Sequence, residues 1–285
     1  MLDVEFRDRA LYVPAADALV CADLHLGRDA TSAVQAPLGE RRTLPKRLTA
    51  LCDYFSPAEV VIAGDVLHSF SGTPGDAAES FDRIARAIEA RDARLVVTPG
   101  NHDTMLAGVW NGRATPAYRL DVGTADRTTD DDGSCGNRSN DRINGGEPSD
   151  GSGIDDGGNR SGSGDGGTGH DDWIGDGGVV VCHGHEPPET EAGTYVIGHD
   201  HPAIEIEGQR RPCYLYGPDA YKGADVLMVP ALTELAAGVV INRMSARDFQ
   251  SPLVADSGTL RPIVRDEDVD ETLWFPPLSE FRSML

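Results

Sequence analysis

The sequence predicts an α/β fold, with α+β character in its second half, because of the order of its hydrophobic segments. In the first half, short runs rich in Val, Ile and Leu alternate with segments of helical periodicity. That alternation favours parallel strands joined by right-handed crossovers. In the second half, short strand-like runs follow one another through turns, which favours an antiparallel or mixed sheet.

Four strands stand out in order along the chain, because each is a continuous apolar run that ends in polar residues. Such runs are typical of strands buried on both faces. Between the first three we expect helices at about 40–55 and 76–91, the second with Phe81, Ile84 and Ile88 on one face. The four strands are ALVCADLH (18–25), EVVIAGD (59–65), RLVVTPGNH (94–102) and GVVVCHGH (178–185). The later strands are TYVIGH, PAIEIEG, PCYLYG, VLMVPA and AGVVINRM.

Residues 121–178 differ in composition from the rest of the chain. They hold 17 of the 33 glycines and 13 aspartates, but only four residues of the Leu, Ile, Val or Phe type. Such a segment buries too little apolar surface to offset the entropy of ordering. We therefore expect 123–176 to be a disordered acidic insertion within a single domain spanning 1–285. A calcium-binding glycine/aspartate repeat is the alternative, although no fixed nonapeptide period is present.

The net charge of −22 and the presence of only two lysines beside 23 arginines indicate a halophilic surface. At ordinary salt such a surface repels nucleic acid and itself. Molar salt shortens the screening length to about 3 Å and removes both effects. The charge therefore indicates the solvent rather than the partner, and it gives a nucleic-acid substrate no support.

Cysteine usage and the N-terminus favour a reduced, cytoplasmic location. The five cysteines are scattered and form no CxxC pair, which argues against a disulfide framework or a thiolate zinc site. The N-terminus MLDVEFRDRALYV lacks the basic-then-apolar order of a signal peptide. No run of 18 apolar residues is present, so we expect no membrane span.

Polar clusters follow the predicted strands at their carboxyl ends, where α/β sheets bind ligands. Asp23 and His25 are two residues apart, so an extended segment would place both on one face, and the same holds for His199 and His201. The remaining members are the carboxylate of Asp65, the amide of Asn101 and the imidazoles of His102, His183 and His185.

These clusters combine carboxylate oxygen, amide oxygen and imidazole nitrogen without sulfur. That donor set suits Mn²⁺, with Fe, Zn²⁺ or Co²⁺ as alternatives, better than Ca²⁺ or a structural zinc. Seven or more donors exceed what one ion needs. They suit two divalent metal ions about 3.5–4 Å apart that share a bridging carboxylate.

The motif order ADLHLG, VIAGDVLH, TPGNHD, CHGH and IGHDHPA resembles that of the calcineurin-like metallophosphoesterases, and looks closest to their archaeal SbcD-related branch. The resemblance covers most of 1–122 and 178–254. It implies a calcineurin-like metallophosphoesterase fold, a two-sheet mixed β-sandwich flanked by helices, with a dinuclear site. Carried over by motif, the first ion would be held by Asp23, His25 and His201, the second by Asn101, His183 and His199, and Asp65 would bridge them.

The resemblance also implies an activity, hydrolysis of a phosphomonoester or phosphodiester by a metal-bridging hydroxide. His102 would stabilise developing charge or protonate the leaving oxygen. Asp103 would either orient His102 or cap the following turn. Arg28 would meet substrate phosphate or be a plain surface arginine. His68 is expected to lie at the surface or behind the ligands, His185 has no assigned role, and His170 lies in the insertion.

Two alternative functions stay open at this point. One is a non-catalytic metal-binding scaffold, and the other is a nuclease subunit that works with a partner ATPase. The acidic C-terminal stretch RDEDVDETLW carries no basic patch, which gives contact with nucleic acid no visible support. The substrate and the oligomeric state are not readable from the sequence.

Overall fold

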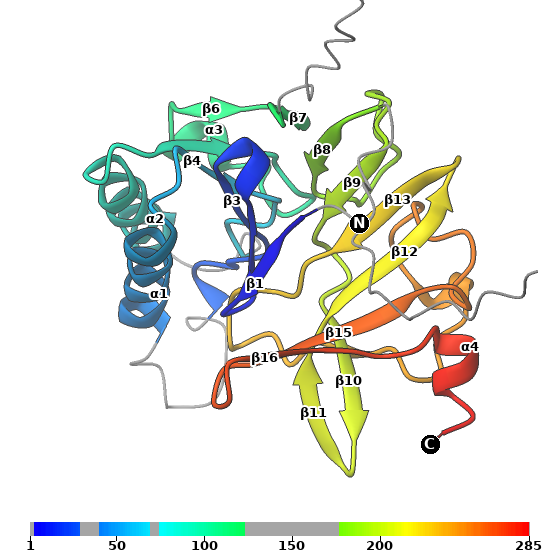
Figure 1. Ribbon diagram of the computed structural model, residues 1–285. Coiled ribbons are helices and arrows are strands. Elements are labelled where there is room, and N and C mark those ends of the chain that lie inside the picture. Colours follow the sequence, from blue (N-terminus) through cyan, green and yellow to red (C-terminus); the bar gives the residue numbers. More distant parts are fainter. Residues whose placement is uncertain (1–2, 29–39, 69–73, 123–176, 285) are drawn as a thin grey trace, which may run out of the picture. The chain divides into compact units, whose positions relative to one another are not determined.

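Two β-sheets pack face to face in the computed structural model, which describes residues 3–28, 40–68, 74–122 and 177–284 (Figure 1). The first sheet has six strands in the order β1-β2-β3-β4-β5-β6, antiparallel from β1 to β3 and parallel from β3 to β6. Its strands are β1 (Glu5–Arg7), β2 (Ala10–Val13), β3 (Ala18–Cys21), β4 (Glu59–Ile62), β5 (Arg94–Val97) and β6 (Arg113–Ala114).

The second sheet has seven strands in the order β16-β15-β12-β13-β9-β8-β7, and it mixes parallel and antiparallel pairs. Its strands are β7 (Ala117–Leu120), β8 (Val179–Cys182), β9 (Thr194–Ile197), β12 (Tyr214–Tyr221), β13 (Ala224–Met228), β15 (Arg261–Asp266) and β16 (Glu271–Trp274). A third, three-stranded sheet joins β10 (Pro202–Ile206), β11 (Gln209–Pro212) and β14 (Val239–Val240). The predicted change from parallel to mixed pairing is confirmed.

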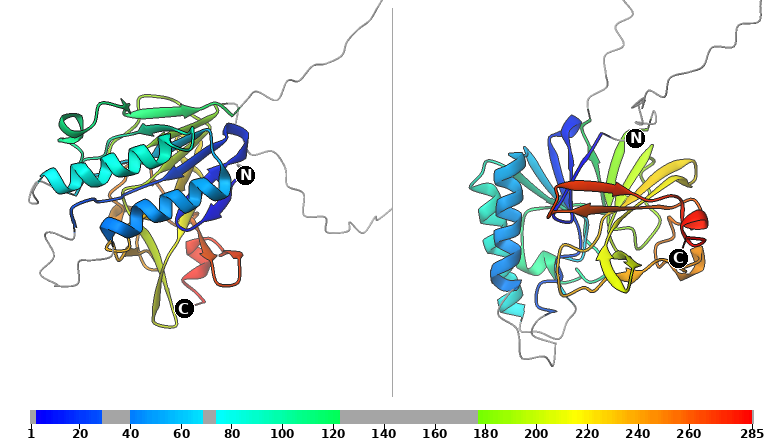
Figure 2. Two further views of the ribbon diagram at one scale, coloured as in Figure 1. Left: turned by 90° about the vertical axis from the view of Figure 1, so that its left-hand side faces the viewer. Right: turned by 60° about the horizontal axis from the view of Figure 1, so that its bottom comes forward.

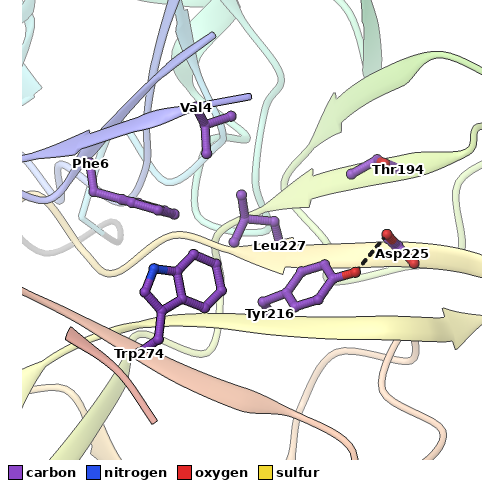
Figure 3. Close-up of a pocket in the computed structure, with 7 residues that line it drawn as sticks. All are labelled: Val4, Phe6, Thr194, Tyr216, Asp225, Leu227 and Trp274. Carbon is purple, nitrogen blue, oxygen red and sulfur yellow. Dashed lines mark hydrogen bonds between the residues drawn. The ribbon is translucent and has the colours of Figure 1, made fainter. Parts of the chain in front are cut away.

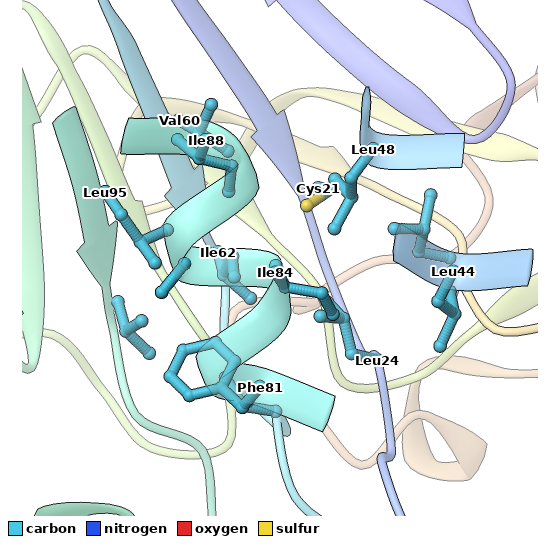
Figure 4. Close-up of a cluster of buried hydrophobic side chains, with 14 of the residues drawn as sticks. Cys21, Leu24, Leu44, Leu48, Val60, Ile62, Phe81, Ile84, Ile88 and Leu95 are labelled. Carbon is cyan, nitrogen blue, oxygen red and sulfur yellow. The ribbon is translucent and has the colours of Figure 1, made fainter. Parts of the chain in front are cut away.

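Two long helices, α1 (Glu40–Phe55) and α2 (Pro74–Glu89), lie side by side on the outer face of the six-stranded sheet (Figures 1 and 2). Phe81, Ile84 and Ile88 recur at helical spacing, so α2 presents one apolar face to the sheet. Together with Leu44 and Leu48 of α1, they form a buried cluster against β3, β4 and β5 (Figure 4). The helix expected at 76–91 begins two residues earlier, where Pro74 occupies the first turn that proline tolerates.

The core between the two sheets is built by alternation along each strand. In β8, Val179 and Val181 face the six-stranded sheet, whereas Val180 and Cys182 face the opposite side. That opposite side is covered by irregular chain and short elements rather than by long helices. Those elements are the three-stranded sheet, the 3₁₀ turn Ala246–Asp248 and α4 (Leu278–Phe281).

The remaining short elements are the 3₁₀ turn Pro14–Ala16 and α3 (Leu106–Val109). The described residues on both sides of the expected insertion form one compact unit, so the two parts of the chain build the same fold. The insertion itself, 123–176, lies outside the described residues, as does His170. Within the described part of the chain, no helix is both long and apolar enough to cross a membrane.

Strand register determines where the polar clusters meet. Ala18 of β3 pairs with Glu59 of β4, which pairs with Arg94 of β5. The three strands therefore end at the same edge of the sheet. Strands β8, β9 and β13 are likewise parallel, and a bridge between Ala22 and Ala231 brings the ends of the two sheets together.

Candidate metal centre

All seven predicted ligands come together at this shared edge, on the loops that follow β3, β4, β5, β8 and β9. Their donor atoms form two overlapping triads, Asp23–His25–His201 and Asp23–Asp65–His183, in each of which the atoms lie within 4.8 Å of one another. Four of the seven are buried and form the floor, namely Asp23, His25, Asp65 and His183. His199 and His201 are half-buried and Asn101 is exposed, so they form the rim.

The first group of donors consists of Asp23, His25 and His201. The Nε2 atoms of His25 and His201 are 3.2 Å apart, and His201 Nε2 is 3.3 Å from Asp23 Oδ1. Asp23 is fully buried, its Oδ2 accepts the backbone N–H of His199 at 3.1 Å, and its Oδ1 has no hydrogen-bond partner. A buried carboxylate oxygen without a partner is costly, and a cation would satisfy it.

The second group consists of Asn101, His183 and His199. His183 Nε2 lies 3.2 Å from Asn101 Oδ1 and 3.1 Å from His199 Nδ1. His183 donates its Nδ1–H to the carbonyl of Ala63 at 3.0 Å, so its Nε2 carries a lone pair. That lone pair faces the Asn101 oxygen, which is a second acceptor. Two facing acceptors fit a shared cation, so these residues suit a metal ion.

Asp65 lies between the two groups and presents one oxygen to each. Its Oδ1 is 3.5 Å from His183 Nε2, and its Oδ2 is 3.9 Å from His25 Nε2. Gly100 permits this close approach, because a Cβ on Gly100 would lie 2.2 Å from Asp65 Oδ1. The arrangement matches the bridging position that the motif order implies for Asp65.

Burial keeps most of the imidazoles neutral. It is the largest cause that lowers the pKa of His25 to about 2, followed by the neighbouring His201 and His68. Burial likewise lowers the pKa of His183 and of His199 to about 4. Burial also opposes charge on His201, but the nearby carboxylates of Asp23 and Asp65 outweigh burial and raise its pKa. Neutral imidazoles have the free lone pair that metal binding requires.

The backbone of the ligands is unusual, and it corrects one prediction. Asp23, His25, Asp65, His199 and His201 all have φ between +46° and +76°. The prediction that extended strands place each i, i+2 pair on one face is therefore wrong, because β3 and β9 end before the ligands begin. Left-handed backbone persists at a functional site only where the surrounding structure holds it.

Comparison with known proteins adds one decisive finding to this geometry. The family model described as calcineurin-like phosphoesterase matches residues 17–229. The chain belongs to the calcineurin-like phosphoesterase family. No curated protein matches the chain. Among solved structures, the nuclease MPE of Pseudomonas putida aligns with 90% of this chain and 88% of its own at 19% identity and a TM-score of 0.49.

Membership of this family of metal-using hydrolases confirms the predicted fold and the general chemistry. The match at that TM-score carries no argument about function. Neither comparison bears on the archaeal SbcD-related branch, which stays a prediction. The ligand roles also stay predictions, although the structure brings all seven residues together.

His102 lies on the accessible rim of the candidate metal centre. Its side chain is 34% exposed, its Nε2 is 3.9 Å from Asp65 Oδ2, and its backbone N–H donates to Asp65 Oδ1 at 3.0 Å. The rings of His102 and His68 stack with centroids 5.9 Å apart and planes 18° apart, and both rings meet His25 edge to face. His68 thus lies behind the predicted ligand His25, the second of the two positions expected for it.

The Asp103 carboxylate accepts hydrogen bonds from backbone amides. Within the described part of the chain, none of its hydrogen bonds goes to His102. Its carboxylate accepts the N–H groups of Val66, Leu67 and Gly100 at 3.2, 2.9 and 2.9 Å. Burial is the main cause that raises its pKa, and these three hydrogen bonds oppose the rise. Asp103 therefore joins the loop that carries Asp65 to the loop that carries Asn101, a geometry that neither predicted role described.

Three further side chains lie near the centre. The His185 ring is 5.2 Å from that of His183 and 6.1 Å from that of His199, centroid to centroid. Burial is the main cause that lowers the pKa of His68, and the charge of Arg28 adds to it. Sequence reasoning overlooked Asp200, a buried carboxylate in the middle of GHDH, although its position between two predicted ligands was a usable signal.

A small apolar pocket elsewhere lies between β1 and the strands of the seven-stranded sheet (Figure 3). Its volume of about 10 Å³ matches a single water molecule. It is lined by Val4, Phe6, Thr194, Tyr216, Asp225, Leu227 and Trp274, none of them a predicted ligand. The pocket is therefore too small for an organic substrate and takes no part in the phosphoesterase site.

Proposed function

We propose that this protein is a metal-dependent phosphoesterase that hydrolyses a phosphomonoester or phosphodiester at a dinuclear centre. One observation carries the proposal. The two oxygens of Asp65 face two separate groups of oxygen and nitrogen donors, each built from histidines and an amide or carboxylate. Asp23, His25 and His201 would hold one ion, Asn101, His183 and His199 the other, and Asp65 both.

When bound, two divalent cations lower the pKa of water and neutralise charge on phosphoryl oxygens. The chain supplies the rest. The buried carboxylates of Asp23 and Asp65 supply the negative charge that holds the cations, and the surrounding apolar residues exclude bulk water from the floor. The exposed Asn101 and the half-exposed His102 leave the rim open to a phosphoester.

His102 would act on the substrate. It is the partly exposed imidazole nearest the bridging carboxylate that is not assigned to a metal, so it is available to donate to a phosphoryl or leaving-group oxygen. Asp103 serves it indirectly by fixing the loop on which it lies. Arg28 would meet a phosphate oxygen beside the first group of donors.

The test is a phosphoester panel run with each divalent metal, in high salt because of the acidic composition. We expect Mn²⁺ to support hydrolysis of bis-p-nitrophenyl phosphate, with Fe, Zn²⁺ and Co²⁺ compared in parallel. Metal content by mass spectrometry separates this from the scaffold alternative. A protein that takes up two ions but turns over no member of the panel would be a scaffold.

A further inference from the structure

We propose that Asp200 is a positioning residue of the metal centre, which ties the His199–His201 loop to a C-terminal segment at residues 249–254. The inference rests on the proposed function, because it takes His199 and His201 to be metal ligands. Asp200 lies between them in the sequence, but its carboxylate is engaged elsewhere.

The Asp200 carboxylate is almost fully buried, with the residue 3% exposed. Its Oδ1 accepts the backbone N–H of Gln250 at 2.7 Å, and its Oδ2 accepts that of Ser251 at 3.0 Å. Both oxygens therefore hold consecutive amides from a segment 50 residues further along the chain. Charge-assisted bonds of this kind are stronger than neutral ones, so the contact is a fixed link.

The segment that presents these amides is itself anchored in the core. Phe249, Leu253 and Val254 are buried against the outer face of the seven-stranded sheet. The Ser251 hydroxyl accepts the Leu253 N–H at 3.3 Å, which closes the turn. Asp200 is therefore held by a rigid surface.

The same C-terminal region pairs with the chain that follows His201. Val239 donates its N–H to the His201 carbonyl at 2.8 Å, and Asn242 exchanges two hydrogen bonds with the backbone of Glu205 at 2.9 and 2.8 Å. The family model ends at residue 229, so this support comes from outside the matched region. The loop that carries His199 and His201 is thus supported by residues that lie outside the region matched by the family model.

The loop needs such support because of its backbone. His199 and His201 have φ of +76° and +48°, and their imidazoles diverge to the two groups of donors. Groups that orient metal ligands change metal affinity or activity by about 10–100-fold when removed. We expect loss of the Asp200 link to weaken Mn²⁺ binding within that range while the protein stays folded.

The sharpest test removes the hydrogen bond between Gln250 and Asp200 by deleting its donor in the C-terminal segment. Gln250→Pro deletes the donor N–H without touching Asp200, and Phe249 already has the extended backbone (φ −75°, ψ 139°) that precedes proline. Gln250→Ala keeps the N–H and is the matched control, since the Gln250 side chain is exposed. We expect the proline variant to bind Mn²⁺ about 10-fold more weakly in calorimetry, and the alanine variant to bind like wild type.

A second pair of variants changes the acceptor of these hydrogen bonds, the Asp200 carboxylate. Asp200→Asn keeps the size but replaces one acceptor with a donor that faces an amide. Asp225→Asn is its control, because Asp225 also accepts two hydrogen bonds, from Tyr216 and Asp219, but belongs to no ligand loop. We expect only Asp200→Asn to weaken Mn²⁺ binding, with circular dichroism confirming that both variants fold.

A third measurement needs no substitution, because coupling between two sites is reciprocal. If Asp200 links the segment to the centre, loading the wild-type chain with Mn²⁺ slows hydrogen exchange at the amides of Gln250 and Ser251. Unchanged exchange there, or Gln250→Pro and Asp200→Asn proteins that bind Mn²⁺ as tightly as wild type, would overturn the inference alone. A wild-type protein that binds no metal would instead remove the proposed function and the inference with it.

Discussion

The two ends of the parallel strands β3, β4 and β5 both bury carboxylates, but they satisfy them differently. At the amino end, Glu59 is 4% exposed and accepts hydrogen bonds from the Tyr118 hydroxyl and from Arg94. At the carboxyl end, Asp23 and Asp65 are equally buried, and the ion-pair neighbours of both among the described residues are imidazole nitrogens. Asp23 Oδ1 has no hydrogen-bond partner among the described residues.

Burial alone therefore does not distinguish these carboxylates, but their neighbours do, because Glu59 has a cationic partner in Arg94 whereas Asp23 has an unsatisfied oxygen. The Glu59 group is complete within the chain and stabilises the fold. Under the proposed function, the Asp23 and Asp65 group is incomplete until cations supply the missing charge. Left-handed backbone does not separate the two ends, since five proposed ligands have it at the carboxyl end and Asp17, Ser56 and Asp92 have it at the amino end. Function costs stability at the carboxyl end of these strands.

The largest expected effect comes from the bridging carboxylate. Asp65→Asn removes the charge that both ions share, so we expect hydrolysis to fall by about 10³-fold or more, which corresponds to several kcal/mol of lost charge stabilisation. In the metal-free protein, the substitution also removes one of two neighbouring buried charges, Asp23 being the other. The Tm of the metal-free variant should therefore equal or exceed that of wild type.

Glu59→Gln is the matched control at the other end of the strands. It neutralises an equally buried carboxylate, but one that Arg94 and Tyr118 already satisfy. We expect it to lower the Tm and leave turnover unchanged. A Glu59→Gln variant that loses activity as completely as Asp65→Asn would show that the two ends do not differ in the way described.

The next largest effect separates His102 from the ligands around it. His102→Ala removes the imidazole on the rim but leaves every proposed donor in place, so we expect a rate loss of about 10²–10⁴-fold with unchanged metal content. The measurement is single-turnover hydrolysis at saturating Mn²⁺, together with metal analysis of the same sample. Loss of metal instead of rate would make His102 a ligand.

The elements of this fold were predictable where a short-range pattern encodes them. Continuous apolar runs predicted the strands β3, β4, β5 and β8. The helical spacing of Phe81, Ile84 and Ile88 predicted the helix α2. Register then brings the ends of parallel strands together, which is why ligands spread from Asp23 to His201 could be grouped before their positions were known.

The supporting contacts were not predictable, and the reason is physical. The groups that hold Asp200 and Asp103 are backbone N–H groups, which every residue except proline carries, so no sequence pattern identifies Gln250 or Val66 as a partner. The left-handed φ values also could not be predicted from the sequence. Asp and His adopt that conformation here, and a glycine, the usual sequence sign of it, is not needed.

A smaller effect should come from metal loading itself. A ligand that binds only the folded state at 100 times its Kd stabilises that state by about 2.7 kcal/mol. Adding Mn²⁺ to chelator-treated protein should therefore raise the Tm, and returning the chelator should reverse the rise. Thermal unfolding of Glu59→Gln should show the same increment, since its defect lies at the other end of the strands. Asp65→Asn should show little or none.

The smallest expected effect lies within the Glu59 group. Burial and the hydrogen bond to Glu59 raise the pKa of Tyr118, so its hydroxyl keeps the proton and donates it at 2.7 Å. Tyr118→Phe removes that bond, which as a bond to a charged group is worth about 1.5 kcal/mol or somewhat more. Arg94 still contacts the carboxylate, so we expect the lower end of that range, a fall of about 3–6 °C in Tm.

Metal affinity and turnover should not change in Tyr118→Phe, because neither Tyr118 nor Glu59 contributes a donor to the centre. Calorimetric Mn²⁺ titration and hydrolysis of the same substrate check this directly. A variant that keeps its Tm but binds Mn²⁺ more weakly would mean that the strands transmit changes from one end to the other. The two ends would then be one coupled system rather than a complete structural group and an incomplete functional one.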